Sequence, residues 1–162
     1  MIRLSPTYVN PLRLLLLLMV SVSLPVLSPA NAQRRAPADD DGPLFHEYRG
    51  IQIGSLADDV RKKLGNPADK STEQDFFVFN EKETAQILYD KAGKVVTISV
   101  DFLTGADGVL TPKQLFGGEI EAKPDGSKYK MVRYPKAGCW LSYNRTAGAT
   151  PLVTVTLQKI ER

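Results

Sequence analysis

Hydrophobic positions along residues 44–104 first recur at a helical spacing and then alternate as they do in strands. Ser55 is expected to cap the helix, and Gly65 is expected to end it in a left-handed conformation. Three apolar residues between them are four apart and therefore share one helical face: Leu56, Val60 and Leu64.

Strand-like runs follow this helix. They are expected at Phe76–Asn80, Thr84–Asp90 and Val95–Phe102, and Lys91–Lys94 would join the last two as a hairpin. In the third run Val96, Ile98, Val100 and Phe102 alternate with polar residues, which is typical of an antiparallel sheet with one covered face.

The second half of the chain shows a similar order of elements. Thr111-Pro112 predicts a short capped helix that ends at Gly117-Gly118. Three further strands are expected, at Tyr129–Tyr134, Cys139–Asn144 and Val153–Ile160.

These patterns predict an α+β fold, in which an antiparallel sheet is packed on one face by one or two short helices. Residues 44–104 would be a first helix-plus-three-strand unit, and residues 105–162 a second, degenerate unit that shares the sheet. The proposed alignment pairs Val78 with Val132 and Ile87 with Leu141. Chance similarity between hairpins is the alternative.

Residues 1–32 have the pattern of a secretory signal peptide: a basic start, an apolar run and an Ala-x-Ala end. We therefore expect an exported protein, periplasmic or extracellular; an uncleaved anchor is the alternative. Residues 33–43 are polar and charged, and are expected to form a disordered leader. No cysteine stands directly after the predicted cleavage site, so no lipid anchor is expected in the mature chain. No membrane span is expected either, because the apolar run is well short of the roughly 20 residues that a span needs and Pro25 and Pro29 break its extension.

Charge and cysteine content narrow the class of partner. Two of the 21 basic residues fall within residues 1–32, whereas all 18 acidic residues follow, so the remaining chain has a net charge near +1. This balance gives no support to nucleic-acid binding. Cys139 is the only cysteine and is expected to be a buried core thiol.

The sequence contains no recognisable catalytic constellation. His46 is the only histidine, and neither it nor Cys139 lies in a catalytic motif. We expect a protein that is not an enzyme and that uses no metal or cofactor.

One stretch resembles a known family. Residues Ile51–Gly54, Asp59-Val60 and Leu64–Pro67, with the hairpin that begins at Ile87, resemble the SmpA/OmlA (BamE-like) family of outer-membrane assembly proteins. The doubled arrangement resembles the β-lactamase-inhibitory-protein fold. The resemblance implies a cell-envelope protein that binds other proteins.

A binding site is predicted on the sheet face opposite the helices. With Val78 and Val132 directed inward, the outward set would combine aromatic, methionine, arginine and leucine side chains, which is typical of interaction hot spots: Trp140, Arg133, Met131, Phe77, Phe79 and Leu88. A shift of one residue in a strand would reverse its faces, and residues 44–48 could cover the sheet instead.

The predicted function is a non-catalytic, secreted or periplasmic module that binds a protein partner, of unknown identity, through this face. Two alternatives remain at this point. One is an envelope protein that binds a lipid or small ligand, and the other is an inhibitor of a secreted hydrolase.

Overall fold

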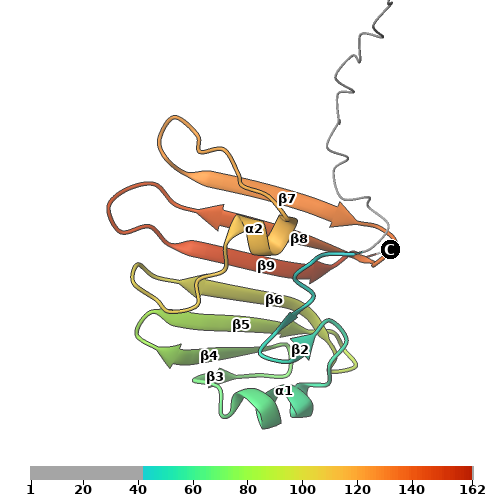
Figure 1. The fold of residues 1–162 in the computed structure, drawn as a ribbon. Helices are drawn as coiled ribbons and strands as arrows, with labels where there is room; N and C mark the ends of the chain where they lie inside the picture. Colours follow the sequence, from blue (N-terminus) through green and yellow to red (C-terminus); the bar gives the residue numbers. More distant parts are fainter. Residues whose placement is uncertain (1–41, 162) are drawn as a thin grey trace, which may run out of the picture. The chain divides into compact units, whose positions relative to one another are not determined.

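The computed structural model describes residues 42–161, so the predicted signal peptide and nearly all of the predicted leader lie outside the described residues. A seven-stranded antiparallel sheet dominates this part of the chain (Figure 1). In spatial order its strands are β3 (Asp69–Lys70), β4 (Gln74–Asn80), β5 (Glu83–Tyr89), β6 (Val95–Phe102), β9 (Val153–Lys159), β8 (Cys139–Arg145) and β7 (Lys128–Tyr134).

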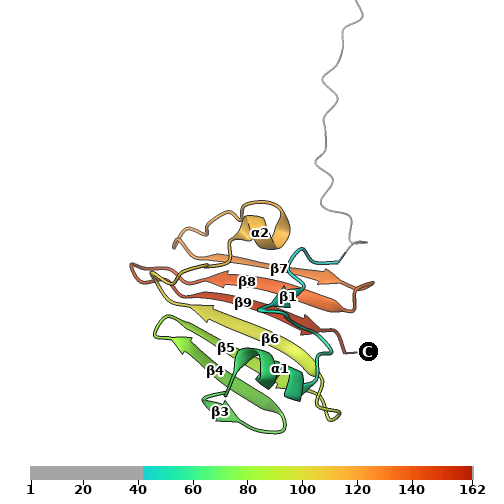
Figure 2. The ribbon, with the colours of Figure 1, turned by 60° about the horizontal axis from the view of Figure 1, so that its bottom comes forward.

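One face of the sheet is covered, and we call it the inner face (Figures 1 and 2). Its cover consists of the hairpin β1 (Glu47–Tyr48) and β2 (Ile51–Gln52), helix α1 (Ala57–Leu64) and helix α2 (Pro112–Phe116). These elements share one hydrophobic core with the strands, to which they contribute Tyr48, Ile51, Val60, Leu115 and Phe116. Residues 44–48, considered above as a possible cover of the outer face, instead contribute Tyr48 and Phe45 to the core beneath the inner face.

The predicted α+β fold class is wrong, because the protein contains much more strand and much less helix than that class implies. The described residues are 42% strand and 11% helical, so the protein is mainly an antiparallel sheet. Helix α1 has eight residues and α2 has five. Both helices are too short to form a layer of their own, because an isolated helix of this length is marginal and depends on packing.

The predicted helix-plus-three-strand repeat is also wrong. Seven of the nine described strands form a single sheet, and β3 and the β1–β2 hairpin have no counterpart in the second half. The proposed equivalence of Val78 and Val132 fails as well, because Val78 is 54% exposed whereas Val132 packs against the core.

A β-bulge in β4 explains this failure of alignment. The β4–β5 turn contains two residues, Glu81-Lys82, and β4 has a bulge near its end. The β7–β8 turn, residues 135–138, is two residues longer, which leaves the faces unchanged, and β7 pairs with β8 without a bulge. In consequence Asp75 lies opposite Ile87, whereas Val132 lies opposite Leu141. An odd offset between two strands reverses the face that each side chain occupies.

Individual strands and turns were predicted more accurately. The β5–β6 hairpin was predicted within one residue at each end of both strands. Helix α2 begins with the expected capping at Thr111, whose side chain accepts from the backbone N–H of Gln114, and ends at Gly117, where φ is 73°. Helix α1 differs from the prediction at its start, where Leu56 and not Ser55 is the N-cap.

Candidate functional site

The sheet face opposite the helices, which we call the outer face, is crossed by three rows of paired side chains. Each row has one residue from each of β4, β5, β6, β9, β8 and β7. The rows are Gln74, Leu88, Thr97, Gln158, Trp140, Arg133; then Phe76, Gln86, Ser99, Thr156, Ser142, Met131; and Val78, Thr84, Asp101, Thr154, Asn144, Tyr129.

The middle of the outer face is polar and is internally hydrogen-bonded. The hydroxyls of Ser99 and Thr156 lie 3.0 Å apart, and the Thr154 hydroxyl donates to Asp101 Oδ1 at 2.6 Å. Such cross-strand pairs stabilise the sheet and hold its central side chains in place. The larger apolar and aromatic side chains of this face lie on the outer strands, β4 and β5 at one end of the sheet and β8 and β7 at the other.

The most prominent of these groups consists of Tyr129, Met131, Arg133 and Trp140, which we call the β7–β8 patch. Arg133 lies directly opposite Trp140, and Met131 is opposite Ser142. Tyr129 is 51% exposed and Met131 is 47% exposed. Aromatic, methionine and arginine side chains of this kind are enriched in the contact surfaces of protein complexes.

The structure separates the six predicted site residues into three groups. Trp140, Arg133 and Met131 lie together in the β7–β8 patch. Leu88 lies on the same face and in the same row as Trp140, but three strands away. At about 4.8 Å per strand, this separation is roughly 14 Å.

Phe77 and Phe79 lie on the inner face, so their predicted outward position is wrong. Phe77 is 1% exposed, and its ring stacks on that of Phe79. The reversal follows from the register of β4, where Phe77 pairs with the buried Ala85. Phe76 and Val78 occupy the outward positions of this strand instead.

Tyr129 is the member of the patch that the sequence reasoning missed. It has the same parity in β7 as Met131 and Arg133, since successive side chains of a strand alternate between faces. That parity could have identified it once Met131 had been placed outward.

The inner face holds two buried carboxylates, which are the other candidates for chemistry. Asp75 in β4 is fully buried. It accepts two hydrogen bonds from Arg61 of α1, at 2.8 and 3.0 Å, and one from the Tyr89 hydroxyl at 2.7 Å. Arg61 also donates to the Ser71 carbonyl. Burial, together with the bond to Asp75, raises the pKa of Tyr89.

The second carboxylate, Glu83 in β5, has a comparable set of partners. It accepts from the Tyr48 hydroxyl at 2.6 Å and from Arg49 at 2.7 Å. Burial alone would raise the pKa of Glu83, but the bonds from Arg49 and Tyr48 outweigh it and hold this pKa below its ordinary value. The Arg49 guanidinium also lies 4.1 Å from the centre of the Phe79 ring.

Both clusters are arranged to hold the covering elements on the sheet. Each joins one strand residue to an arginine and a tyrosine, and all the described buried side-chain polar atoms have a hydrogen-bond partner. Both carboxylates are buried, and their hydrogen bonds go to groups of the fold itself, so neither is presented to a substrate. Neither cluster is therefore favoured as an active site.

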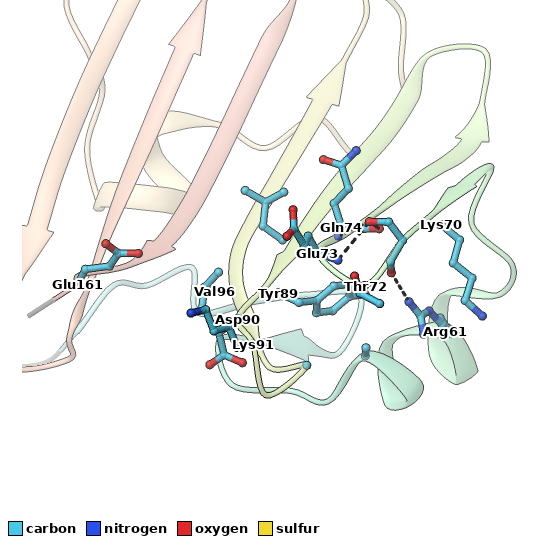
Figure 3. A pocket seen from close by; sticks show the side chains of 14 residues that line it. Arg61, Lys70, Thr72, Glu73, Gln74, Tyr89, Asp90, Lys91, Val96 and Glu161 are labelled. Carbon is cyan, nitrogen blue, oxygen red and sulfur yellow. Dashed lines mark hydrogen bonds between the residues drawn. The ribbon is translucent and has the colours of Figure 1, made fainter.

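An open depression of about 1110 Å³ lies beside α1, where the turn before β4 meets the β5–β6 hairpin (Figure 3). Both positively and negatively charged side chains line the depression. Two of them already form hydrogen bonds within the protein. Arg61 is bonded to Asp75, and Asp90 accepts from hairpin amides. Lys70, Lys91, Glu73 and Glu161 also line it, so the depression offers no single charge preference to a ligand.

The two remaining reactive side chains, Cys139 and His46, do not form a catalytic site with other described residues. Cys139 is buried, as predicted, and burial raises the pKa of its thiol, which lowers the fraction of reactive thiolate. His46 is exposed. Within residues 42–161, no three metal-binding side chains are grouped around a common point.

Neither of the two helices in the described residues is both long and apolar enough to cross a membrane. Comparison with known proteins adds no relative, since no family model, curated protein or solved structure matches this chain.

Proposed function

We propose that this protein is a non-catalytic, exported binding module of the cell envelope that engages a protein partner through its outer face. The observation that carries the proposal is the β7–β8 patch. It combines Trp140, Met131, Tyr129 and Arg133 on the face opposite the described helices, where Lys123 Nζ lies 5.9 Å from the centre of the Tyr129 ring.

The composition and setting of the patch support a protein partner. A few aromatic and arginine side chains usually supply most of the affinity of a protein interface, and polar surroundings exclude water around them. Trp140 lies between Arg133 and Gln158 in its row, and the hydrogen-bonded centre of the outer face lies beside it. This arrangement provides an anchor and a polar rim.

A lipid or small apolar ligand is less well supported. Such a ligand is usually buried for most of its surface in an apolar pocket. The depression of about 1110 Å³ is open and carries charged side chains from α1 and the neighbouring turns. Export and a relationship to the SmpA/OmlA family stay proposals, carried by residues 1–32 and by the motif at residues 51–67.

The experiment is affinity capture from an envelope fraction with the wild-type protein, with Trp140→Ala and with Val78→Ala as the matched control. Val78 lies on the outer face but on β4, five strands away from β7. We expect Trp140→Ala to lower the yield of the captured partner at least tenfold, and Val78→Ala to leave it unchanged. Retention of every partner by a folded Trp140→Ala variant would refute the assignment.

A further inference from the structure

Strand β7 forms an open edge of the sheet. It is the last strand in the spatial order, and its seven residues pair with β8 without a register shift. In an antiparallel pair, alternate residues direct their N–H and C=O groups away from the partner strand. Within residues 42–161, no backbone hydrogen bond outside the β7–β8 ladder involves Lys128–Arg133.

The opposite edge of the sheet is protected. The short strand β3 pairs with Phe76 and Asp75 of β4, and a bulge interrupts β4 near Val78. Short covering strands and bulges are common means by which proteins prevent edge-to-edge association. Strand β7 has neither of these features.

The charges of β7 are all positive and form no salt bridge within the described residues, although Lys130 Nζ lies 4.9 Å from the centre of the Phe116 ring. Lys128, Lys130 and Arg133 take part in none of the salt bridges of residues 42–161, whereas Arg49 and Arg61 are each paired with a carboxylate. Lys128 also lies directly opposite Arg145. Like charges in opposing positions destabilise a strand pair, so the fold alone gives no reason for this arrangement.

We propose that β7 binds an extended acidic segment of a partner protein by strand addition, so that the segment becomes an eighth strand. Backbone hydrogen bonds would supply affinity, and the lysines would select acidic side chains. The same positive charge repels the β7 edge of a second copy. The inference rests on the proposed function only in treating the protein as a binding module.

Strand geometry specifies the acidic pattern. Lys128 and Lys130 point to the inner side, and Arg133 points to the outer side. An antiparallel segment would therefore place acidic residues opposite Arg133, Lys130 and Lys128 at positions i, i+3 and i+5. Direct cross-strand neighbours lie close enough for ion pairing.

The probe is a roughly nine-residue peptide of threonine and valine with three glutamates at this spacing, measured by fluorescence anisotropy at low salt. We expect saturable binding, together with slower hydrogen exchange at alternate β7 amides. The same peptide N-methylated at alternate residues keeps its charge but cannot form the ladder, and we expect it to bind at least about tenfold more weakly. Equal binding of both peptides would overturn strand addition.

Charge reversal tests the role of the lysines. Lys128→Glu places a carboxylate opposite Arg145, so this variant should fold normally, and we expect it to weaken peptide binding about fivefold or more. Lys70→Glu makes the same change on β3, at the other edge, and should leave binding unchanged. Equal losses in both variants would show only a general charge effect and would overturn the site.

Different variants test the partner site on the outer face and the peptide site at the β7 edge, so one proposal can fail while the other holds. Trp140→Ala alters the outer face but not the β7 edge, and should retain peptide binding. Lys128→Glu alters the inner side of β7 but leaves the β7–β8 patch intact. Loss of peptide binding in Trp140→Ala would place the peptide on the outer face. Concentration-dependent self-association, with protection of the β7 amides from exchange, would show that β7 pairs with a second copy of the chain. Either of these two results would overturn the inference.

Discussion

At the scale of single residues, the Arg61–Asp75 pair should dominate the response of the fold to mutation. Asp75 is fully buried, and Arg61 supplies two of its three hydrogen bonds. Removing one partner of a buried ion pair leaves an uncompensated charge, which typically costs about 3–5 kcal/mol. We predict a loss of this size in the free energy of unfolding for Arg61→Ala, measured by urea denaturation.

Lys62→Ala is the matched control for Arg61→Ala. Lys62 is the next residue of α1 and is exposed, so its replacement should change the unfolding free energy by less than about 0.5 kcal/mol. Similar losses in both variants would mean that α1 is sensitive to any substitution, and that the buried pair has no special role.

Glu83 should make stability depend on acid pH. Because its pKa in the folded protein lies below its ordinary value, the unfolded state binds a proton more readily than the folded state. The contribution of Glu83 is therefore complete above the unfolded pKa of about 4.3, and is lost as pH falls through the folded pKa.

We predict that the wild-type protein loses stability more steeply than Glu83→Gln between about pH 5 and pH 3. The measurement is the free energy of unfolding from denaturant titrations across this range. Glu81→Gln, exposed in the β4–β5 turn, is the control and should retain the wild-type slope. If Glu83→Gln and wild type had parallel pH profiles, the bonds from Arg49 and Tyr48 would not be the source of the dependence.

At the scale of elements, α2 depends on its capping residues. The Thr111 side chain accepts from the Gln114 backbone N–H, and the Gln114 side chain accepts in turn from the Thr111 backbone. Loss of such a cap typically costs about 1 kcal/mol. We predict this loss for Thr111→Ala in thermal or urea unfolding, and much less for Thr111→Ser, which keeps the hydroxyl. Equal losses would point to the methyl group instead.

Capping also shows where sequence reasoning is sufficient and where it is not. Thr111-Pro112 and Gly117 specify α2 through contacts within five or six residues of chain, so the prediction for α2 was accurate. The start of α1 is determined by distant residues. Ala57 N–H donates to the Gly93 carbonyl, and Leu56 bridges Lys94, so the backbone around Ser55 pairs with the β5–β6 hairpin.

The same distinction explains the candidate site. Trp140, Met131 and Arg133 were placed together correctly because β7 and β8 alternate regularly on both sides of their turn. Phe77 was misplaced because β4 was aligned with β7, although β4 contains a one-residue bulge near Val78 and β7 contains none. The alternation of side chains along a strand shows which residues share a face of the sheet. It does not show which of the two faces is covered by other elements.

At the scale of the whole described region, residues 42–161 should behave as one cooperative unit. Strands β6 and β9 join the two halves through six consecutive residue pairs, and one hydrophobic core extends from Phe77 of β4 to Cys139 of β8. A sheet with a single core has no boundary at which half of it could unfold while the other half remains packed.

Cys139 provides a test of this cooperativity. Its thiol is 6% exposed, and burial raises its pKa, so a thiol reagent should reach it only when the protein opens. We predict that the free energy of opening, measured from thiol labelling in increasing urea, equals the global value and has the same dependence on denaturant. A Cys139→Ala chain carrying Lys62→Cys, exposed on α1, should be labelled at once without denaturant. A denaturant dependence clearly below the global value would show that β7 and β8 separate locally, and would contradict the single cooperative core.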